Sequence, residues 1–254
     1  MINRRTFSAT LAGATASLFA ASVRAQVGPR VRNVVLVHGA YADGSSWADV
    51  IGRLQAAGLR ATAVQNPLTS LADDVAATRN VLALQEGPTV LIGHSWAGTV
   101  ISEAGIDPKV SALVYVAARA PDAGEDYAAL AAKFPKPPAS AGLVVSGGFA
   151  QLNEEAFLNY FAGDVDPAKA RVLYAVQGRI STTLFANRTT AAAWKSKPSW
   201  YAVSKNDKTT APELQRFLAE RMKARTIELE SSHASLISHP KEIAELILEA
   251  AANS

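Results

Sequence analysis

The chain has 254 residues, of which 49% are hydrophobic and 19% charged, with 16 glycines, 12 prolines and no cysteine. This length can bury a sizeable core in one large domain or two small ones. The composition excludes collagen-like, disordered and disulfide-scaffold proteins. Without cysteine the sequence offers no thiol nucleophile, no disulfide and no cysteine-liganded metal site.

The formal net charge of +3 comes from the start of the chain. Residues 1–25 contain Arg4, Arg5 and Arg24 and no acidic residue, so the remaining 22 basic residues balance the 22 acidic ones. A neutral remainder lacks the basic surface that nucleic acids and anionic membranes attract. We therefore expect no nucleic-acid partner and no membrane-surface binding.

Residues 1–25 have the three-part layout of an export signal. Arg4 and Arg5 precede a short run rich in alanine and leucine, and small residues surround a cleavage site after Ala25. This run is too short for a helix that must cross about 30 Å of hydrocarbon. The arginine pair and the residues around it resemble a twin-arginine signal. We expect export to the periplasm or beyond, with no membrane insertion after processing; an alanine-rich N-terminal helix of the mature protein is the alternative.

Apolar runs of strand length alternate with amphipathic segments of helix length. In chain order we predict a strand over 31–37, a helix over 45–57, a strand over 59–64, a helix over 70–85, strands over 88–92, 110–117 and 199–203, a helix over 212–224, a strand over 226–229 and a helix over 240–251. Such alternation predicts an α/β fold with a mostly parallel, doubly wound sheet covered by helices on both faces.

The alternation is interrupted over residues 121–196, which carry several prolines, the Gly147-Gly148 pair and short helical patches. We interpret this segment as a mainly helical cap that is inserted into the core. The predicted organisation is an export signal (1–25), the first part of the core (26–120), the cap (121–196) and the second part of the core (197–254).

The segment from Gly93 to Gly98 (GHSWAG) lies between a predicted buried strand and a predicted helix. A sharp turn at this place lifts a serine hydroxyl out of the sheet, and small neighbours let the strand and helix backbones approach each other. The usual pattern is G-x-S-x-G, whereas this chain has Ala97 at the fifth position, which is still small. We predict that Ser95 is a nucleophile, with an ordinary turn serine as the alternative.

The general base is chosen among four histidines. His38 ends the first strand and is expected to shape a turn, His94 adjoins Ser95 on the turn and should point away from it, and His239 precedes the last helix. His233 follows the last strand, at the carboxyl edge of the sheet where Ser95 also emerges and where open α/β folds build their sites. We predict that His233 is the base, with a surface histidine as the alternative.

Asp207 follows the strand over 199–203 and is expected at the same edge. A carboxylate there would hold the tautomer of His233 and stabilise its protonated form; capping of the next helix is its alternative role. Catalysis of acyl transfer also needs donors for the oxyanion, each worth about 100- to 1000-fold in rate. We assign these to the backbone N–H groups of Ala40 and Trp96, although His38-Gly39 could form an ordinary strand-ending turn.

Four segments, LVHGAYADGSSW, VLIGHSWAG, SKNDKTTAPELQ and ELESSHASLISHP, resemble the α/β-hydrolase superfamily, and the similarity covers most of residues 32–250. Within it they most resemble the small esterase and hydroxynitrile-lyase-like branch, which implies a triad of Ser95, Asp207 and His233. Lyases of this type carry Thr after the first-strand His and Lys after the catalytic His. This chain has Gly39 and Ala234 instead, so hydrolysis is the expected reaction.

These features predict a serine hydrolase that cleaves small, fairly apolar carboxylic esters through an acyl-enzyme, with no cofactor and no metal, because no phosphate-binding, dinucleotide-binding or metalloprotease motif is present. Substrate contacts are expected from Tyr41, Phe134, Phe161 and Phe185, unless these rings pack the cap onto the core. The alternatives are a lyase or carbon–carbon bond-cleaving enzyme on the same scaffold, and a non-catalytic ligand-binding protein.

Overall fold

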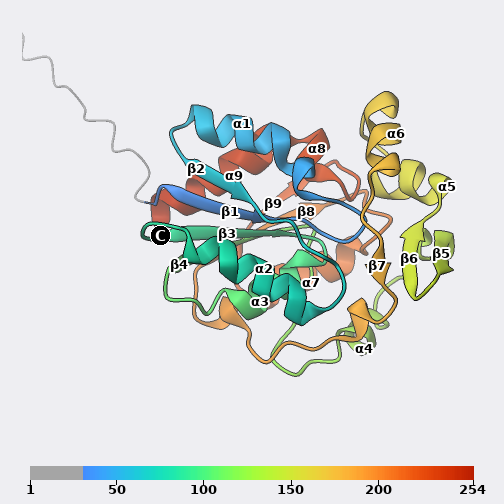
Figure 1. Cartoon of the computed structure of the whole chain (residues 1–254), viewed down its shortest axis with the longest axis horizontal. Coiled ribbons are helices and arrows are strands. Elements are labelled where there is room, and N and C mark those ends of the chain that lie inside the picture. The colour runs from blue at the N-terminus through green and yellow to red at the C-terminus, as the bar shows by residue number, and fades with distance from the viewer. Residues whose placement is uncertain (1–30) are drawn as a thin grey trace, which may run out of the picture.

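The computed structural model describes residues 31–254, and the predicted export signal lies outside this range (Figure 1). Six parallel strands form the main sheet in the order β2-β1-β3-β4-β8-β9. Their bounds are β1 Asn33–Val37, β2 Arg60–Ala63, β3 Thr89–His94, β4 Val110–Val116, β8 Ser199–Ser204 and β9 Arg225–Leu229. Each predicted strand of the core is present, which confirms the expected sheet.

The burial of each strand follows its position in the sheet. β1, β3 and β8 are buried along their whole length, and β4 is buried at all but one residue. The edge strands β2 and β9 are more exposed. Central strands of a parallel sheet are covered on both faces, so they are continuous apolar runs in the sequence.

Helices cover both faces of the sheet, as expected (Figure 1). One face carries α1 (Ala48–Ala56), α8 (Ser235–Ser238) and α9 (Pro240–Asn253), and the other carries α2 (Leu71–Ala83), α3 (Ala97–Ala104) and α7 (Pro212–Arg221). The hydroxyl of Ser70 caps α2 by accepting a hydrogen bond from the Asp73 N–H at 3.1 Å.

The segment between β4 and β8 forms the cap, at the right of Figure 1. It contains α4 (Tyr127–Ala131), α5 (Glu154–Ala156), α6 (Pro167–Ala175) and several single-turn helices, together with an antiparallel sheet of β5 (Leu143–Ser146), β6 (Phe149–Leu152) and β7 (Ile180–Ser181). This second sheet was not predicted. Gly147 and Gly148 have φ angles of 59° and 77°, so this glycine pair forms the two-residue turn of a hairpin.

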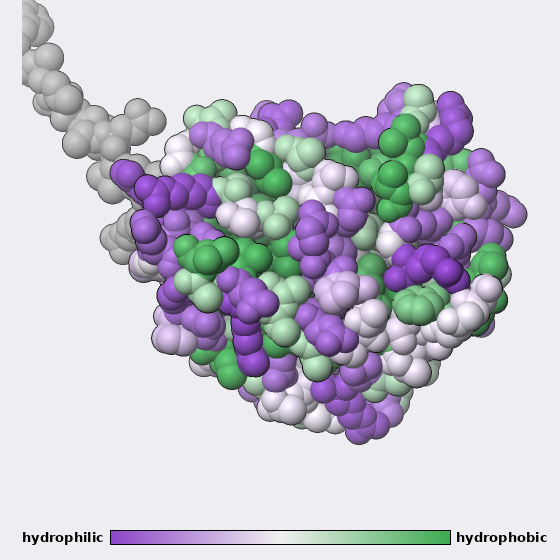
Figure 2. Space-filling model, in the orientation of Figure 1, coloured by the Kyte–Doolittle hydropathy of each residue, from purple (hydrophilic) through white to green (hydrophobic). Residues whose placement is uncertain are grey.

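The surface in the view of Figure 2 mixes polar and apolar side chains, with apolar ones gathered over α6. Two of the exposed apolar residues there are Val172 and Val176. Within residues 31–254, none of the helices combines the length and the apolar character that a membrane crossing requires.

Candidate active site

Ser95 occupies the sharp turn between β3 and α3. Its φ of 54° lies in the left-handed region, which costs free energy for a residue with a side chain and is typical of functional turns. Hydrogen bonds hold the turn: the Ser95 N–H donates to the Val116 carbonyl, and the Ser95 carbonyl accepts from the Gly98 and Arg119 N–H groups, all at 3.0 Å. The turn is therefore fixed to the end of β4.

Two glycines are required by close backbone approaches around this turn. A Cβ atom at Gly93 would lie 2.7 Å from the Ala97 carbonyl oxygen. A Cβ atom at Gly98 would lie only 1.8 Å from the Arg119 carbonyl oxygen. The glycine at the sixth position of GHSWAG is thus needed for α3 to pack against the end of β4.

We expect Gly98→Ala to lower the free energy of unfolding by about 3 kcal/mol, because the added methyl group collides with backbone that cannot move aside easily. Gly52→Ala is the matched control: no atom lies within 4 Å of a Cβ there, so it should stabilise α1 by about 0.5–1 kcal/mol. Denaturant unfolding of both variants measures the difference. Equal free energies of unfolding for Gly98→Ala and Gly52→Ala would contradict the close packing of Gly98 against the Arg119 carbonyl.

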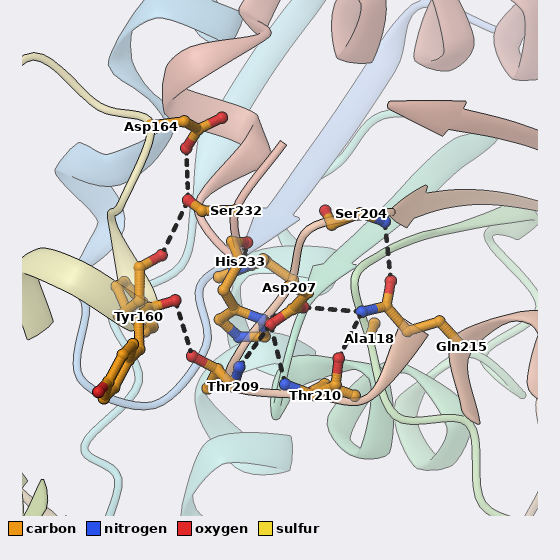
Figure 3. Close-up of polar contacts among 12 residues, drawn as sticks. Ala118, Tyr160, Asp164, Ser204, Asp207, Thr209, Thr210, Gln215, Ser232 and His233 are labelled. Atoms are coloured by element: carbon orange, nitrogen blue, oxygen red, sulfur yellow. Dashed lines mark hydrogen bonds and ion pairs between the residues drawn. The ribbon is translucent and has the colours of Figure 1, made fainter. Parts of the chain in front are cut away.

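Asp207 and His233 are brought together at the carboxyl edge of the sheet, as Figure 3 shows. The Asp207 Oδ2 lies 2.6 Å from the His233 Nδ1, and both side chains are fully buried. The Asp207 Oδ1 accepts from the N–H groups of Thr209 (2.7 Å) and Thr210 (2.9 Å), and Oδ2 also accepts from the Gln215 amide (2.7 Å). Four donors therefore surround this carboxylate.

The arrangement determines which nitrogen of His233 is available. A carboxylate only accepts hydrogen bonds, so the Nδ1 of His233 donates to Asp207 and the lone pair lies on Nε2. That Nε2 is buried and has no hydrogen-bond partner among residues 31–254. The structure contains no hydrogen bond between Ser95 and His233, and such bonds are often long before substrate binds.

His94 packs against the ring of His233. The two ring centroids are 4.8 Å apart, and the His94 Nε2 donates to the His233 carbonyl at 3.0 Å. Burial holds the pKa of His94 well below its usual value, so this ring stays neutral. His38 has a separate role, since its Nδ1 donates to the Gly39 carbonyl and its Nε2 accepts from the Asn66 N–H, both at 2.9 Å. It fixes the turn after β1, as expected.

The cap holds the loop that carries His233. Phe161 ends a π-helical turn of the cap, and its carbonyl accepts from the Ser232 hydroxyl at 3.2 Å and from the Ala234 N–H at 3.1 Å. Its ring lies edge-on to His233, with centroids 5.1 Å apart. Ser232 also donates to Asp164 (Figure 3). Residues on both sides of His233 are thus tied to one cap segment.

A cavity of about 280 Å³ lies between the cap and the core, and Ser95, Ala40 and Trp96 line it together. Ala40 and Trp96 are 2% and 1% exposed, yet their backbone N–H groups have no acceptor within the described part of the chain. Buried N–H groups without a partner are rare in native proteins. Ala40 and Trp96 line the cavity with Ser95, so these two unpaired donors are candidates for binding a developing oxyanion.

The aromatic residues predicted to contact substrate separate into two pairs. Tyr41 and Phe185 line the cavity. Phe134 and Phe161 lie outside its lining: Phe134 packs on Phe217 of α7 with centroids 5.4 Å apart, and Phe161 packs on the two site histidines. Phe161 is buried, whereas Phe134 is half-buried beside the exposed Phe217, and composition alone could not distinguish these positions from the cavity wall.

Gln215 and Asp74 belong to the site and were missed in the sequence. Gln215 lies in α7 and connects Asp207 to the Ser204 N–H, which its Oε1 accepts at 2.9 Å. Asp74 in α2 is fully buried, and its Oδ2 accepts from the Trp96 indole at 2.7 Å. Each is a polar residue on the buried face of an amphipathic helix, and that placement is the signal that could have revealed them.

Asp74 should make stability depend on pH. Burial raises its pKa to about 6, so between pH 4 and 6 the unfolded chain loses this proton while the folded chain keeps it. The free energy of unfolding therefore falls by about 3 kcal/mol as pH rises through this window, and changes no further above it. Asp74→Asn should remove this dependence. Urea unfolding of both proteins at pH 4, 5, 6 and 7 measures it.

The neighbouring Asp73 provides the control for this titration. Its carboxylate is exposed, and hydrogen bonds from the Ser70 and Thr69 hydroxyls lower its pKa. Asp73→Asn should therefore shift the pH dependence in the opposite direction. A difference between Asp74→Asn and the parent that stays constant from pH 4 to pH 7 would contradict the role given to Asp74.

Known proteins of similar sequence and structure complete the description. A family model described as Alpha/beta hydrolase family matches residues 34–246. A carbendazim hydrolyzing esterase from Nocardioides sp. (strain SG-4G) is 32% identical over 158 residues, which cover 57% of this chain and 63% of that protein, less than two thirds of its length. The alpha/beta hydrolase nvfD of Aspergillus novofumigatus (strain IBT 16806) is 24% identical over 241 residues, or 86% of this chain and 96% of the relative.

Two solved structures are similar over most of the chain. A pyrethroid hydrolase from Sphingobium faniae JZ-2 has a TM-score of 0.73 at 23% identity, covering 87% of this chain and 97% of its own. Polyneuridine aldehyde esterase has a TM-score of 0.75 at 19% identity, covering 86% and 98%. Because both identities are below 25%, these structural similarities demonstrate the fold alone.

Proposed function

Because this chain belongs to the alpha/beta hydrolase family, we propose that it is a serine hydrolase that cleaves small, fairly apolar carboxylic esters. The observation that carries the proposal is one cavity wall with Ser95 and the unpaired N–H groups of Ala40 and Trp96. The buried pair of Asp207 and His233 supplies a base with a free Nε2. Nucleophile, base and oxyanion donors are the parts that acyl transfer requires.

In the first half of the reaction, the Ser95 Oγ attacks the ester carbonyl carbon and its proton moves to the His233 Nε2. The carbonyl oxygen becomes an oxyanion that accepts from the Ala40 and Trp96 N–H groups. The carbon–oxygen bond to the alcohol then breaks, and His233 gives its proton to the leaving alkoxide. Asp207 stabilises the imidazolium throughout. The products of this half are an alcohol and an acyl group on Ser95.

In the second half, His233 takes a proton from water, and the resulting hydroxide attacks the acyl carbon. The bond between that carbon and the Ser95 Oγ breaks, and the proton returns to Ser95. The acid leaves and the resting enzyme is restored. Each half is balanced without a redox partner or an external acid.

The names of relatives and neighbours support ester chemistry, since they include an esterase named for carbendazim hydrolysis and a pyrethroid hydrolase. The cavity supports small substrates with apolar groups, because Trp96, Phe185 and Leu214 contribute to its walls. We further propose that the protein acts outside the cytoplasm, on the strength of the signal-like residues 1–25 alone.

The proposal is tested with p-nitrophenyl acetate, butyrate and octanoate. We expect turnover, a burst of p-nitrophenol in the first cycle, and a rate that falls at the longest acyl chain. An aryl dialkyl phosphate should inactivate the enzyme and add one dialkyl phosphoryl group to the peptide that contains Ser95, detected by mass spectrometry. A folded protein without turnover on any ester, or a label on another residue, would favour the lyase or the binding-protein alternative.

A further inference from the structure

Arg119 is the only charged residue among the described residues that line the 280 Å³ cavity. It lies in the loop just after β4, which ends at Val116, and its backbone N–H donates to the Ser95 carbonyl at 3.0 Å. The guanidinium is therefore held on the same wall as the nucleophile. Its neighbours in the lining are aromatic, aliphatic, proline and hydroxyl-bearing residues, none of which offers a negative charge.

The acidic side chains that follow Arg119 are paired with other cations. Their ion pairs are Asp122 with Lys195 (2.6 Å), Glu125 with Arg221 (2.7 Å) and Asp126 with Arg188 (2.8 Å). Arg119 has no ion-pair partner within the region that the structure describes. The titratable groups nearest to it are the hydroxyls of Tyr127 and Tyr41, which stay neutral because burial raises the pKa of each. The positive charge of Arg119 thus remains uncompensated by any carboxylate.

Three aromatic rings fix the position of the guanidinium. Its carbon lies 3.9 Å from the ring centroid of Tyr127, 5.1 Å from that of Phe185 and 5.5 Å from that of Trp96. Such cation–π contacts stabilise the charge from the faces of the rings. They do not replace a planar acceptor for the five N–H donors of an arginine.

Partial burial strengthens the attraction between the Arg119 guanidinium and an anionic ligand. Burial lowers the pKa of Arg119, but an arginine stays protonated in proteins. In a cavity with low dielectric constant, a hydrogen-bonded pair with an anion is much stronger than at an exposed surface. An arginine kept charged on a mostly apolar wall is poorly solvated until an anion arrives.

We propose that Arg119 binds an anionic group of the substrate, so that the preferred members of the small esters proposed above carry one carboxylate, within reach of the scissile bond, on an otherwise apolar body. The reaction on such an ester rests on the function proposed above, whereas binding of the anion at Arg119 does not. The carboxylate can lie in the acyl part or in the alcohol part of the ester, because the cavity extends from Ser95 to several cap elements.

Matched esters test the proposal. For the acyl part, mono-p-nitrophenyl glutarate is compared with p-nitrophenyl valerate, which has the same chain length without the carboxylate. For the alcohol part, 4-carboxyphenyl acetate is compared with phenyl acetate. We expect the parent enzyme to prefer the anionic ester in at least one pair by about 10-fold or more in kcat/KM, as an added charged hydrogen bond allows.

Arg119→Met should lower that preference by about 10- to 100-fold, and Arg119→Lys should retain part of it. Because both esters of a pair have the same leaving group or acyl group, a purely structural role of Arg119 would change both rates by the same factor. Arg171→Met is the control: Arg171 is exposed on α6, and removing it deletes one positive charge outside the cavity lining. The Arg171→Met variant should show the same ratio of kcat/KM between the anionic and the neutral ester as the parent.

The proposal is overturned if the parent prefers the neutral ester in both pairs, or if Arg119→Met leaves the ratio unchanged. If no ester is hydrolysed, the proposed function fails, and binding of glutarate measured by calorimetry decides the anion site independently. Binding that Arg119→Met weakens by 10-fold or more supports the site. Equal binding to both proteins, or none to either, overturns it.

Discussion

Ser95→Ala is expected to lower kcat on p-nitrophenyl butyrate by about 10⁴- to 10⁶-fold, because the proposed acyl intermediate forms on the Ser95 hydroxyl. Some rate above that of water should remain, since the Ala40 and Trp96 N–H groups still bind the oxyanion. Alanine keeps the same Cβ at a φ of 54°, so the backbone cost of the turn is unchanged. Initial rates and thermal unfolding of the two proteins measure both expectations.

Ser45→Ala is the matched control, because Ser45 is an exposed serine in the 3₁₀ turn before α1. Its kcat should stay near that of the parent. Turnover of Ser95→Ala within 10-fold of the parent would show that another residue is the nucleophile. The same variant that has lost turnover should still bind the esters.

Asp207→Asn is expected to lower kcat by about 10⁴-fold through the tautomer of His233. The backbone N–H groups of Thr209 and Thr210 cannot turn away from the position of Oδ1, so the single amide oxygen must face them. The amide NH₂ then faces the His233 Nδ1, which has to accept. Its hydrogen moves to Nε2, and the base can no longer take a proton. Steady-state kinetics near neutral pH measure the loss.

Asp166→Asn is the control for this change. Asp166 caps α6 through its Oδ1, and asparagine is an equally good cap, so neither activity nor stability should change much. The double variant Ser95→Ala with Asp207→Asn should be no slower than Ser95→Ala alone, because the two residues act in one unit. If the fall in kcat of the double variant equals the product of the two single falls, the two residues do not act in one mechanism.

The core could be predicted from the sequence because each element repeats one physical pattern. Central strands such as β3 are continuous apolar runs, and α2 begins at a serine that caps it. The cap lacks such patterns. β5 has four residues, all of them exposed, so its sequence carries no periodicity, and the glycine pair after it was interpreted as an interruption instead of a hairpin turn.

The candidate site could be predicted where a residue with a catalytic type of side chain directly follows a predicted strand. His233 and Asp207 each follow a strand, and parallel strands end at one edge of the sheet, so their meeting follows from topology. Gln215, Asp74 and Arg119 carry no motif. The positions of Gln215 and Asp74 on buried helix faces could mark them as unusual, but the role of each residue depends on its neighbour in another element, which a single sequence does not specify.

The bonds between Phe161 and the loop around His233 have a consequence for exchanging caps between related enzymes. A transplanted cap brings not only a new cavity wall but also the contacts that hold the loop of His233, the proposed general base. A chimera whose cap does not place a backbone carbonyl where that of Phe161 lies should have a lower rate on every substrate, whatever specificity it gains. Cap evolution in this protein is therefore constrained at residues 157–161, whereas the exposed residues 144–146 of β5 lie outside the cavity lining and are freer to diverge.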